Sequence, residues 1–262
     1  MTDVKTFGEV TLQRDGHVAI LEINRPPHNH VTVELMHHLA NALAIVDAER
    51  DLRASVLTTA GKSFCAGADL AAPTGIAHAD GGTGISALYI EAVRLFSVKK
   101  PIVAAVQGAA VGAGLGLALV ADFRVAAPEA RFTANFVKLG FHPGFGITHT
   151  LPRVIGEQRA ALMCLTGRRI KADEALAWGL VDEIAPLASL KDAALTLARE
   201  FAENAPLAVQ ATRATMRREL AAKVKSQTDF EFAEQSALRK TADFAEGVRA
   251  VAERRAGNFT GT

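Results

Sequence analysis

One apolar segment, residues 100–122, constrains the fold of this chain more than any other part of its sequence. It reads KPIVAAVQGAAVGAGLGLALVAD and carries glycines at positions 108, 112, 114 and 116. Three structures are compatible with such a run: a membrane-spanning helix, a dinucleotide-binding unit, or a buried strand followed by a glycine-rich turn and a short helix. Each of them implies a different kind of protein.

A membrane span is favoured by the length of the run, by its lysine flank and by the four-residue spacing of its glycines. Gln107 interrupts the run, however, and Ala and Gly outnumber Leu and Ile. The β-branched residues Ile102 and Val103 directly follow Pro101, an order that suits the start of a strand better than a helix. The span is therefore kept only as an alternative.

The glycine spacing also disagrees with a dinucleotide-binding unit. Gly112, Gly114 and Gly116 alternate with other residues, whereas the dinucleotide fingerprint is G-x-G-x-x-G with an acidic residue about twenty positions further on. The remaining interpretation is a strand at 102–106, a turn, and a helix at about 114–120. Backbone N–H groups at such a turn point toward a bound group, and small residues let that group approach closely.

Composition narrows the class of protein further. The 262 residues can bury one substantial core, and 49% hydrophobic with 22% charged residues is typical of a globular chain. With a net charge of only +1, the chain lacks the excess of basic residues that is typical of proteins that bind nucleic acid or anionic lipid. Cys65 and Cys164 provide neither a disulfide framework nor a zinc spacing, and residues 1–6 lack a signal core. We expect a cytoplasmic protein that binds small ligands.

Hydrophobic periodicity predicts that strands and helices alternate in the first two thirds of the chain and that the last third is helical. Residues 71–84 are predicted to form a surface loop, and residues 139–146 a turn with special backbone angles. Strands are predicted at 18–23, 55–58, 102–106, 123–127 and 131–132. Helices are predicted at 33–50, 86–98, 114–120, 158–165, 172–178, 189–203, 206–220, 229–240 and 243–254.

Four motifs occur along the chain in a characteristic order. Two glycine-rich turns follow predicted strands at residues 66–70 (AGADL) and 112–114 (GAG), and A-x-E-A-x-x-x-G-L-V at 172–181 precedes E-G-x-x-A at 246–250. Together they closely resemble the crotonase family, the enoyl-CoA hydratases and isomerases. The resemblance extends from residue 24 to residue 259, essentially the whole chain.

The resemblance implies an α/β fold, a spiral of repeated ββα units at residues 1–196, with a helical region at 197–262 that packs trimers, often paired into hexamers. It also implies an acyl-CoA or enoyl-CoA thioester as the substrate, with no cofactor beyond the coenzyme A of that substrate. The expected activity is that of a lyase or isomerase in fatty acid and acyl-CoA metabolism.

By position in the family motifs, the backbone N–H groups of Ala68 and Ala113 would form an oxyanion hole around the thioester carbonyl. Donors placed in advance stabilise the enolate that forms during reaction, and losing one typically costs about 3 kcal/mol. Arg25 would lie near coenzyme A or would simply be a solvated surface cation. The residues that the resemblance implies at the substrate are Arg25, Ala66, Gly67, Asp69, Leu70, Gly112, Gly114, Gly116 and Phe136.

The sequence departs from the family pattern at two catalytic positions. A hydratase of this family holds its water and delivers a proton with two glutamates, and an isomerase can work with the second alone. Here the corresponding residues are Gly116 and Phe136. The chain thus keeps the expected thioester site but lacks the usual acid and base.

Three explanations of this loss stay open. Another side chain could transfer protons, with His142 the leading candidate because imidazole titrates near neutral pH, although it could equally satisfy loop backbone. Weaker candidates for proton transfer are His78, Asp80 and Glu91. The protein could instead be a silent acyl-CoA binder, or it could catalyse a reaction such as decarboxylation or hydrolysis in which the substrate supplies a group. We expect no metal site, because the histidine pairs at 28/30 and 37/38 lack a third nearby ligand.

Overall fold

Seven strands form the larger of two sheets in the computed structural model, which describes residues 4–68 and 83–262. Their order is β1 (Lys5–Phe7), β2 (Val10–Asp15), β3 (Val18–Ile23), β4 (Ala54–Thr59), β5 (Ile102–Val106), β7 (Phe123–Ala126) and β10 (Glu183–Ile184). The first three strands pair antiparallel, and the pairs from β3 onward are parallel. A smaller sheet contains β6 (Ala109–Val111), β8 (Arg131–Thr133) and β9 (Arg169–Lys171).

Successive strands alternate between the two sheets. The segment 100–122 forms β5 in the large sheet, β6 in the small sheet and then the helix α3 (Ala113–Val120). The next two strands repeat this step, because β7 joins the large sheet and β8 the small one. The α/β class and the ββα pattern that we expected are therefore present, and the segment 100–122 is not a membrane span. None of the helices in the described part of the chain combines the length and the apolar character needed to cross a bilayer.

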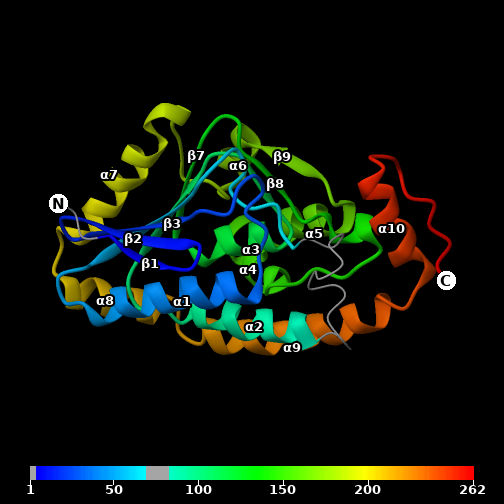
Figure 1. The fold of residues 1–262 in the computed structure, drawn as a ribbon, viewed down its shortest axis with the longest axis horizontal. Helices are drawn as coiled ribbons and strands as arrows, with labels where there is room; N and C mark the ends of the chain where they lie inside the picture. Colours follow the sequence, from blue (N-terminus) through cyan, green and yellow to red (C-terminus); the bar gives the residue numbers. More distant parts are fainter. Residues whose placement is uncertain (1–3, 69–82) are drawn as a thin grey trace.

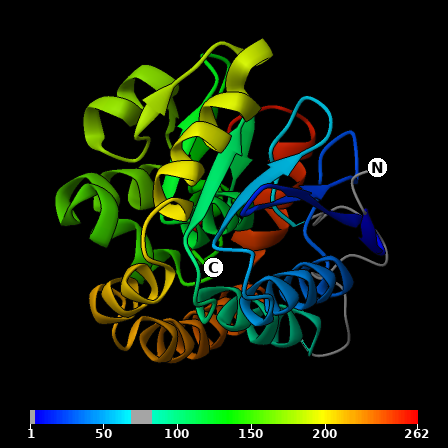
Figure 2. The ribbon, with the colours of Figure 1, turned by 90° about the vertical axis from the view of Figure 1, so that its left-hand side faces the viewer.

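Both faces of the large sheet are buried, which explains its nearly continuous apolar strands. Every residue of β5 is buried: Val103 and Ala105 pack in one cluster with α7 (Leu190–Ala202), whereas Ile102, Ala104 and Val106 belong to the larger core on the other side. Figure 2 shows α7 lying across one face of the sheet. The period-two alternation of a strand thus divides a single apolar run between two cores.

Three long helices pack side by side beneath the sheets in Figure 1: α1 (Val33–Ala48), α2 (Thr83–Phe96) and α9 (Leu220–Leu238). The remaining helices are α4 (Ile147–Ile155), α5 (Glu157–Thr166), α6 (Ala172–Trp178), α8 (Pro206–Met216) and α10 (Ala242–Ala252), with short 3-10 turns η3 (Asn135–Leu139) and η4 (Leu187–Ser189).

Most predicted elements agree with the structure within a few residues. The helix predicted at 172–178 is α6, and Gly179 ends it in the left-handed conformation. The turn at 139–146 carries positive φ angles at Gly140, Phe145 and Gly146, as expected. Asp69, Leu70, His78, Asp80 and most of the predicted loop at 71–84 lie outside the described residues, and α2 begins at Thr83. The division at residue 196 falls inside α7 and stays a prediction.

The strands β1, β2, β6, β9 and β10 and the helix α4 were not predicted, and α9 was predicted too short. The short first strands, β1 and β2, have mixed polar sequences at the edge of the sheet. The helix α4 begins after Gly146 without a capping side chain of its own, and α9 starts nine residues before the predicted helix at 229–240. In both helices the missing signal is supplied by distant parts of the chain.

A carboxylate from α9 replaces the absent local cap of α4. Glu231 is fully buried, and its side chain accepts hydrogen bonds from the N–H groups of Gly146 (2.8 Å) and Thr148 (3.1 Å) and from the Thr148 hydroxyl (2.5 Å). It therefore satisfies N–H groups at the start of α4 that have no partner within the helix. Burial raises the pKa of Glu231 to about 7, although these three hydrogen bonds act in the opposite direction.

The turn η3 and the helix α10 approach each other through two glycines. A Cβ on Gly140 would lie 2.6 Å from the carbonyl oxygen of Asp243, and a Cβ on Gly247 would overlap the main-chain carbonyl of Leu139. Gly247 is therefore required by the close approach of the two backbones. This contact holds α10 against η3.

We predict that Gly247→Ala destabilises the protein by about 2 kcal/mol, because the added methyl group must push α10 away from η3. Thermal denaturation measures the effect. Ala245→Ser, at an exposed position of the same helix, is the matched control and should change stability by less than about 0.5 kcal/mol. A Gly247→Ala protein as stable as the control would contradict the close packing.

The raised pKa of Glu231 predicts a pH dependence of stability. Between its unfolded pKa and about pH 7 the folded carboxyl holds a proton that the unfolded chain releases, so the free energy of unfolding falls as pH rises through this window. Urea unfolding at several pH values should show a smaller fall for Glu231→Gln than for the exposed control Glu234→Gln. Identical pH profiles for the two variants would be the contrary result.

Candidate active site

Backbone hydrogen bonds join the two glycine-rich turns. The N–H of Cys65 donates to the carbonyl of Ala109 (2.9 Å), and the N–H of Val111 donates to the carbonyl of Cys65 (2.9 Å). The turn that follows β4 is thus fixed beside the turn that follows β6. Gly114 allows this approach, since a Cβ there would overlap the Cys65 carbonyl.

The predicted donors, Ala68 and Ala113, are brought to the same cavity. Ala113 is the first residue of α3, so its N–H has no partner within the helix and lies at the positive end of the helix dipole. Gly67 precedes Ala68 with φ 86°, and a Cβ at Gly67 would lie only 2.7 Å from the Val111 carbonyl oxygen. Within residues 4–68 and 83–262, neither of the two N–H groups donates to an acceptor.

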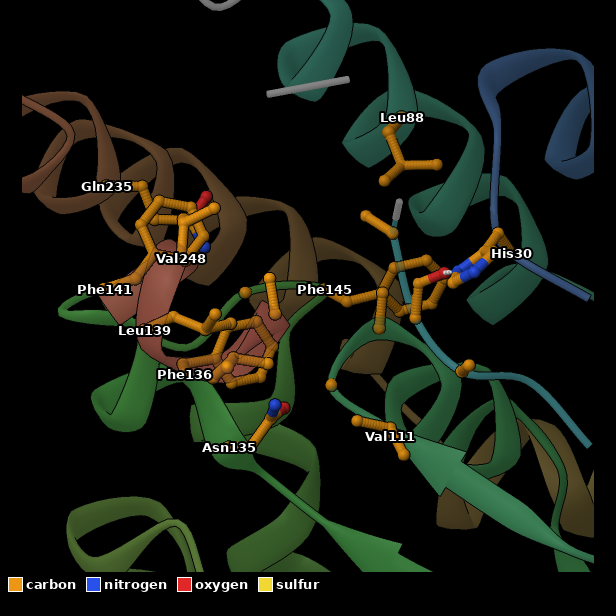
Figure 3. A pocket seen from close by; sticks show the side chains of 18 of the residues that line it. His30, Leu88, Val111, Asn135, Phe136, Leu139, Phe141, Phe145, Gln235 and Val248 are labelled. Carbon is orange, nitrogen blue, oxygen red and sulfur yellow. Dashed lines mark hydrogen bonds between the residues drawn. The ribbon is translucent and has the colours of Figure 1, made fainter. Parts of the chain in front are cut away.

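The cavity has a volume of about 370 Å³ and mainly apolar walls. Figure 3 shows Phe136, Leu139, Phe141 and Val248 together on one side, and Phe145 with His30 on the other. Its polar side chains are His30, Tyr89, Asn135, Arg169 and Gln235. Among the described residues that line the cavity there is no Asp or Glu.

Aromatic rings stand at both positions where the usual carboxylates are missing. Phe136 lines the cavity directly. A Cβ on Gly116 would lie 2.6 Å from the ring of Phe145, so that ring fills the space that a larger residue at 116 would need. Phe145 is fully buried and has φ 64°, an uncommon conformation for a residue other than glycine. The wall next to the two donors is therefore apolar.

His142 is not among the residues that line the cavity, and its role as the leading proton-transfer candidate stays a prediction. Its Nδ1 lies 2.7 Å from the carbonyl oxygen of Pro143, and its ring meets Phe230 edge-on with centroids 6.4 Å apart. The side chain thus satisfies loop backbone, the alternative that the sequence left open.

Other predicted residues separate into two groups. Ala66, Gly67 and Gly112 line the cavity beside the two donors. Arg25 does not: its Nη1 forms an ion pair with Glu9 Oε1 at 2.7 Å. Glu91 also lies outside the lining and pairs with Arg94 (2.6 Å) and His37 (3.1 Å).

Two polar residues of the cavity had no signal in the sequence. Tyr89 of α2 donates its hydroxyl hydrogen bond to Gln235 Oε1 of α9 (2.8 Å), and Gln235 Nε2 donates to the His142 carbonyl (2.8 Å). Burial raises the pKa of Tyr89 above its ordinary value, so the phenol stays protonated. These residues come from helices about 140 positions apart in sequence, and only the packing of α2 on α9 brings them together.

The chemistry available in the cavity is limited. Burial raises the pKa of the Cys65 thiol to about 12, which keeps it from acting as a nucleophile. In the described part of the chain, no three His, Cys, Asp or Glu residues lie close enough together to hold a metal ion. Among the described residues, the arrangement offers two main-chain donors for an oxyanion, apolar walls, and one imidazole, that of His30.

Known proteins share this sequence and fold. A sequence model of the family described as enoyl-CoA hydratase/isomerase matches residues 13–262. A probable enoyl-CoA hydratase of Mycobacterium tuberculosis is 41% identical over 80% of this chain and 82% of its own. The 1,2-epoxyphenylacetyl-CoA isomerase of Escherichia coli is 36% identical over 93% of this chain and 95% of its own. A crystal structure of carnitinyl-CoA hydratase from Mycobacterium avium superposes with a TM-score of 0.84, at 31% identity over 98% of this chain and 100% of that one. The chain therefore belongs to the enoyl-CoA hydratase/isomerase family.

Proposed function

We propose that this protein binds an acyl-CoA thioester and stabilises its enolate between the N–H groups of Ala68 and Ala113. The observation that carries the proposal is the meeting, in one apolar cavity, of two main-chain N–H groups from separate turns, neither of which has an acceptor among residues 4–68 and 83–262. Such donors cost no reorganisation during reaction, and they act most strongly where water is excluded. Coenzyme A enters only as part of the substrate, and no further cofactor is required.

The cavity walls favour a reaction that needs no enzyme carboxylate. Phe136 and Phe145 occupy the places of the usual acid and base, and the described lining contains no Asp or Glu. In a decarboxylation, the electron pair of the breaking C–C bond passes into the thioester carbonyl, so that the enolate forms without a protein base. Solvent then supplies a proton to the α-carbon. We place this reaction class ahead of ordinary hydration, with hydrolysis as a further member of the family's range.

The second candidate is a silent acyl-CoA binder. The observation in its favour is that the ring of Phe136 lies in the cavity where a catalytic carboxylate would stand. The apolar acyl pocket and the two donors would then serve affinity alone. Saturable binding without turnover of any acyl group distinguishes this candidate from an enzyme.

The oxyanion proposal predicts that Ala113→Pro lowers turnover by about 10²- to 10³-fold, because proline has no N–H to donate. Position 113 begins α3, where proline is well tolerated, so the fold should survive. Val33→Pro makes the same change at the first residue of α1 and is the matched control.

The assay incubates the purified protein in deuterated water with short and long 2-enoyl-CoA and with α-carboxyacyl-CoA thioesters, followed by mass analysis. Loss of carbon dioxide with deuterium at carbon 2 supports the favoured reaction class. A hydrated enoyl product would establish ordinary hydration instead. A well-folded Ala113→Pro protein with full activity would refute the assignment of that donor.

We also infer that the protein assembles as a trimer or a dimer of trimers. Two exposed apolar side chains of α8, Leu207 and Met216, are 79% and 75% accessible in the single chain, which supports contact with another copy. Light scattering should give three or six times the 27.7 kDa of one chain. A mass of one chain at micromolar concentration would contradict the assembly. The cytoplasmic location stays a prediction.

A further inference from the structure

A histidine stands directly behind one of the two oxyanion donors. His30 lies in the loop before α1 and lines the cavity, on the same side as Phe145 in Figure 3. Its Nδ1 is 3.1 Å from the carbonyl oxygen of Gly67. The same oxygen accepts a second hydrogen bond, from the N–H of Val31 at 2.9 Å. The Gly67 carbonyl is thus held by two donors from one loop.

The Gly67 carbonyl and the Ala68 N–H belong to one peptide group. In a trans peptide the oxygen and the amide hydrogen lie on opposite edges, so His30 approaches one edge and the bound thioester would approach the other. Hydrogen bonds in a chain polarise one another, which makes the N–H a stronger donor when the carbonyl accepts. His30 can therefore act on the substrate through this peptide without touching the reacting atoms.

The geometry also determines the tautomer of the ring. A carbonyl oxygen only accepts, so the hydrogen bond to Gly67 requires the proton on Nδ1 and leaves Nε2 as the acceptor in a neutral ring. Val31 pairs with Ala68 as an isolated parallel bridge, which keeps the loop in register with the turn. The imidazole is thereby held in one position beside the Gly67 carbonyl.

We propose that His30 is a positioning residue that polarises and orients the Gly67–Ala68 peptide, and thereby strengthens the Ala68 half of the oxyanion hole. The inference rests on the proposed function, because it assumes that a thioester carbonyl binds the Ala68 N–H. It assigns a role to the imidazole of His30, which is the one found among the described residues of the cavity, and it requires no proton transfer by that ring.

The test reads the polarisation of a bound carbonyl directly. Butyryl-CoA labelled with ¹³C at the thioester carbonyl is bound to the wild-type protein and to His30→Phe, which keeps an aromatic ring but has no donor. Isotope-edited infrared spectroscopy then measures the carbonyl stretching frequency. The wild type should lower this frequency relative to the ligand in water, and His30→Phe should lower it by less.

Two further variants separate the hydrogen bond from general disturbance. His30→Asn places its amide nitrogen one bond beyond Cγ, as Nδ1 is in histidine, so it retains an N–H donor at that place and should restore most of the frequency shift. His28→Phe changes an exposed histidine of the same loop that does not line the cavity, and it should behave as the wild type. In steady-state assays with a substrate that the enzyme converts, His30→Phe should lower kcat about two- to fivefold with little change in KM.

The outcomes distinguish the two proposals. An equal frequency shift in wild type and His30→Phe would overturn the role of His30 and leave the oxyanion hole intact. A wild-type protein that binds the probe without any shift would overturn the proposed oxyanion hole, and this inference with it. If circular dichroism shows that His30→Phe is unfolded, His30→Leu replaces it with the same two readings, since leucine has no N–H donor in its side chain.

Discussion

The pairing of Cys65 with Ala109 and Val111 is the contact on which the candidate site depends. Two backbone hydrogen bonds bring together turns that are more than forty residues apart. Each turn contributes to a common cavity one N–H that has no acceptor within the described part of the chain. One turn alone would not form an oxyanion hole, because a single amide supplies only one hydrogen bond to the oxygen. The parallel pairing of β4 and β5 helps to create this meeting, because both strands end at the same edge of the large sheet, and β6 then leads from β5 to the second turn.

The aromatic residues around the donors change what this family site can do. Removing a carboxylate from a cavity usually leaves a space that water fills, but here Phe145 closes the space above Gly116 and Phe136 forms part of the opposite wall. A dry wall strengthens every electrostatic interaction inside the cavity, including those of the two main-chain donors. Under the proposed function, an apolar wall in place of carboxylates would therefore strengthen stabilisation by the two main-chain donors.

Much of the fold could be predicted because its signals are local. The β-branched run of β5, the glycine spacing after it and the stop at Gly179 each depend on neighbouring residues. Motif order alone predicted that Ala68 and Ala113 lie at one cavity, and their role as donors stays a prediction.

The remainder depended on contacts between distant segments. The start of α4 relies on Glu231, some eighty residues away, and Tyr89 meets Gln235 only through helix packing. His142 was favoured for its residue type and its position in a loop, but its direction was decided by Pro143 and Phe230. His30 was considered only as a metal ligand, because nothing in the sequence shows that its ring reaches Gly67.

A site whose donors are main-chain amides has an unusual mutational profile. Most substitutions at Ala68 or Ala113 keep the main-chain amide. The side chains at these two positions can therefore change without loss of the N–H groups. The neighbouring glycines, Gly67 and Gly114, tolerate no larger residue, because a single added methyl group would force the two turns apart. Divergence within such a site can therefore exchange its acid and base residues, as at positions 116 and 136, long before it loses the capacity to hold a thioester oxygen.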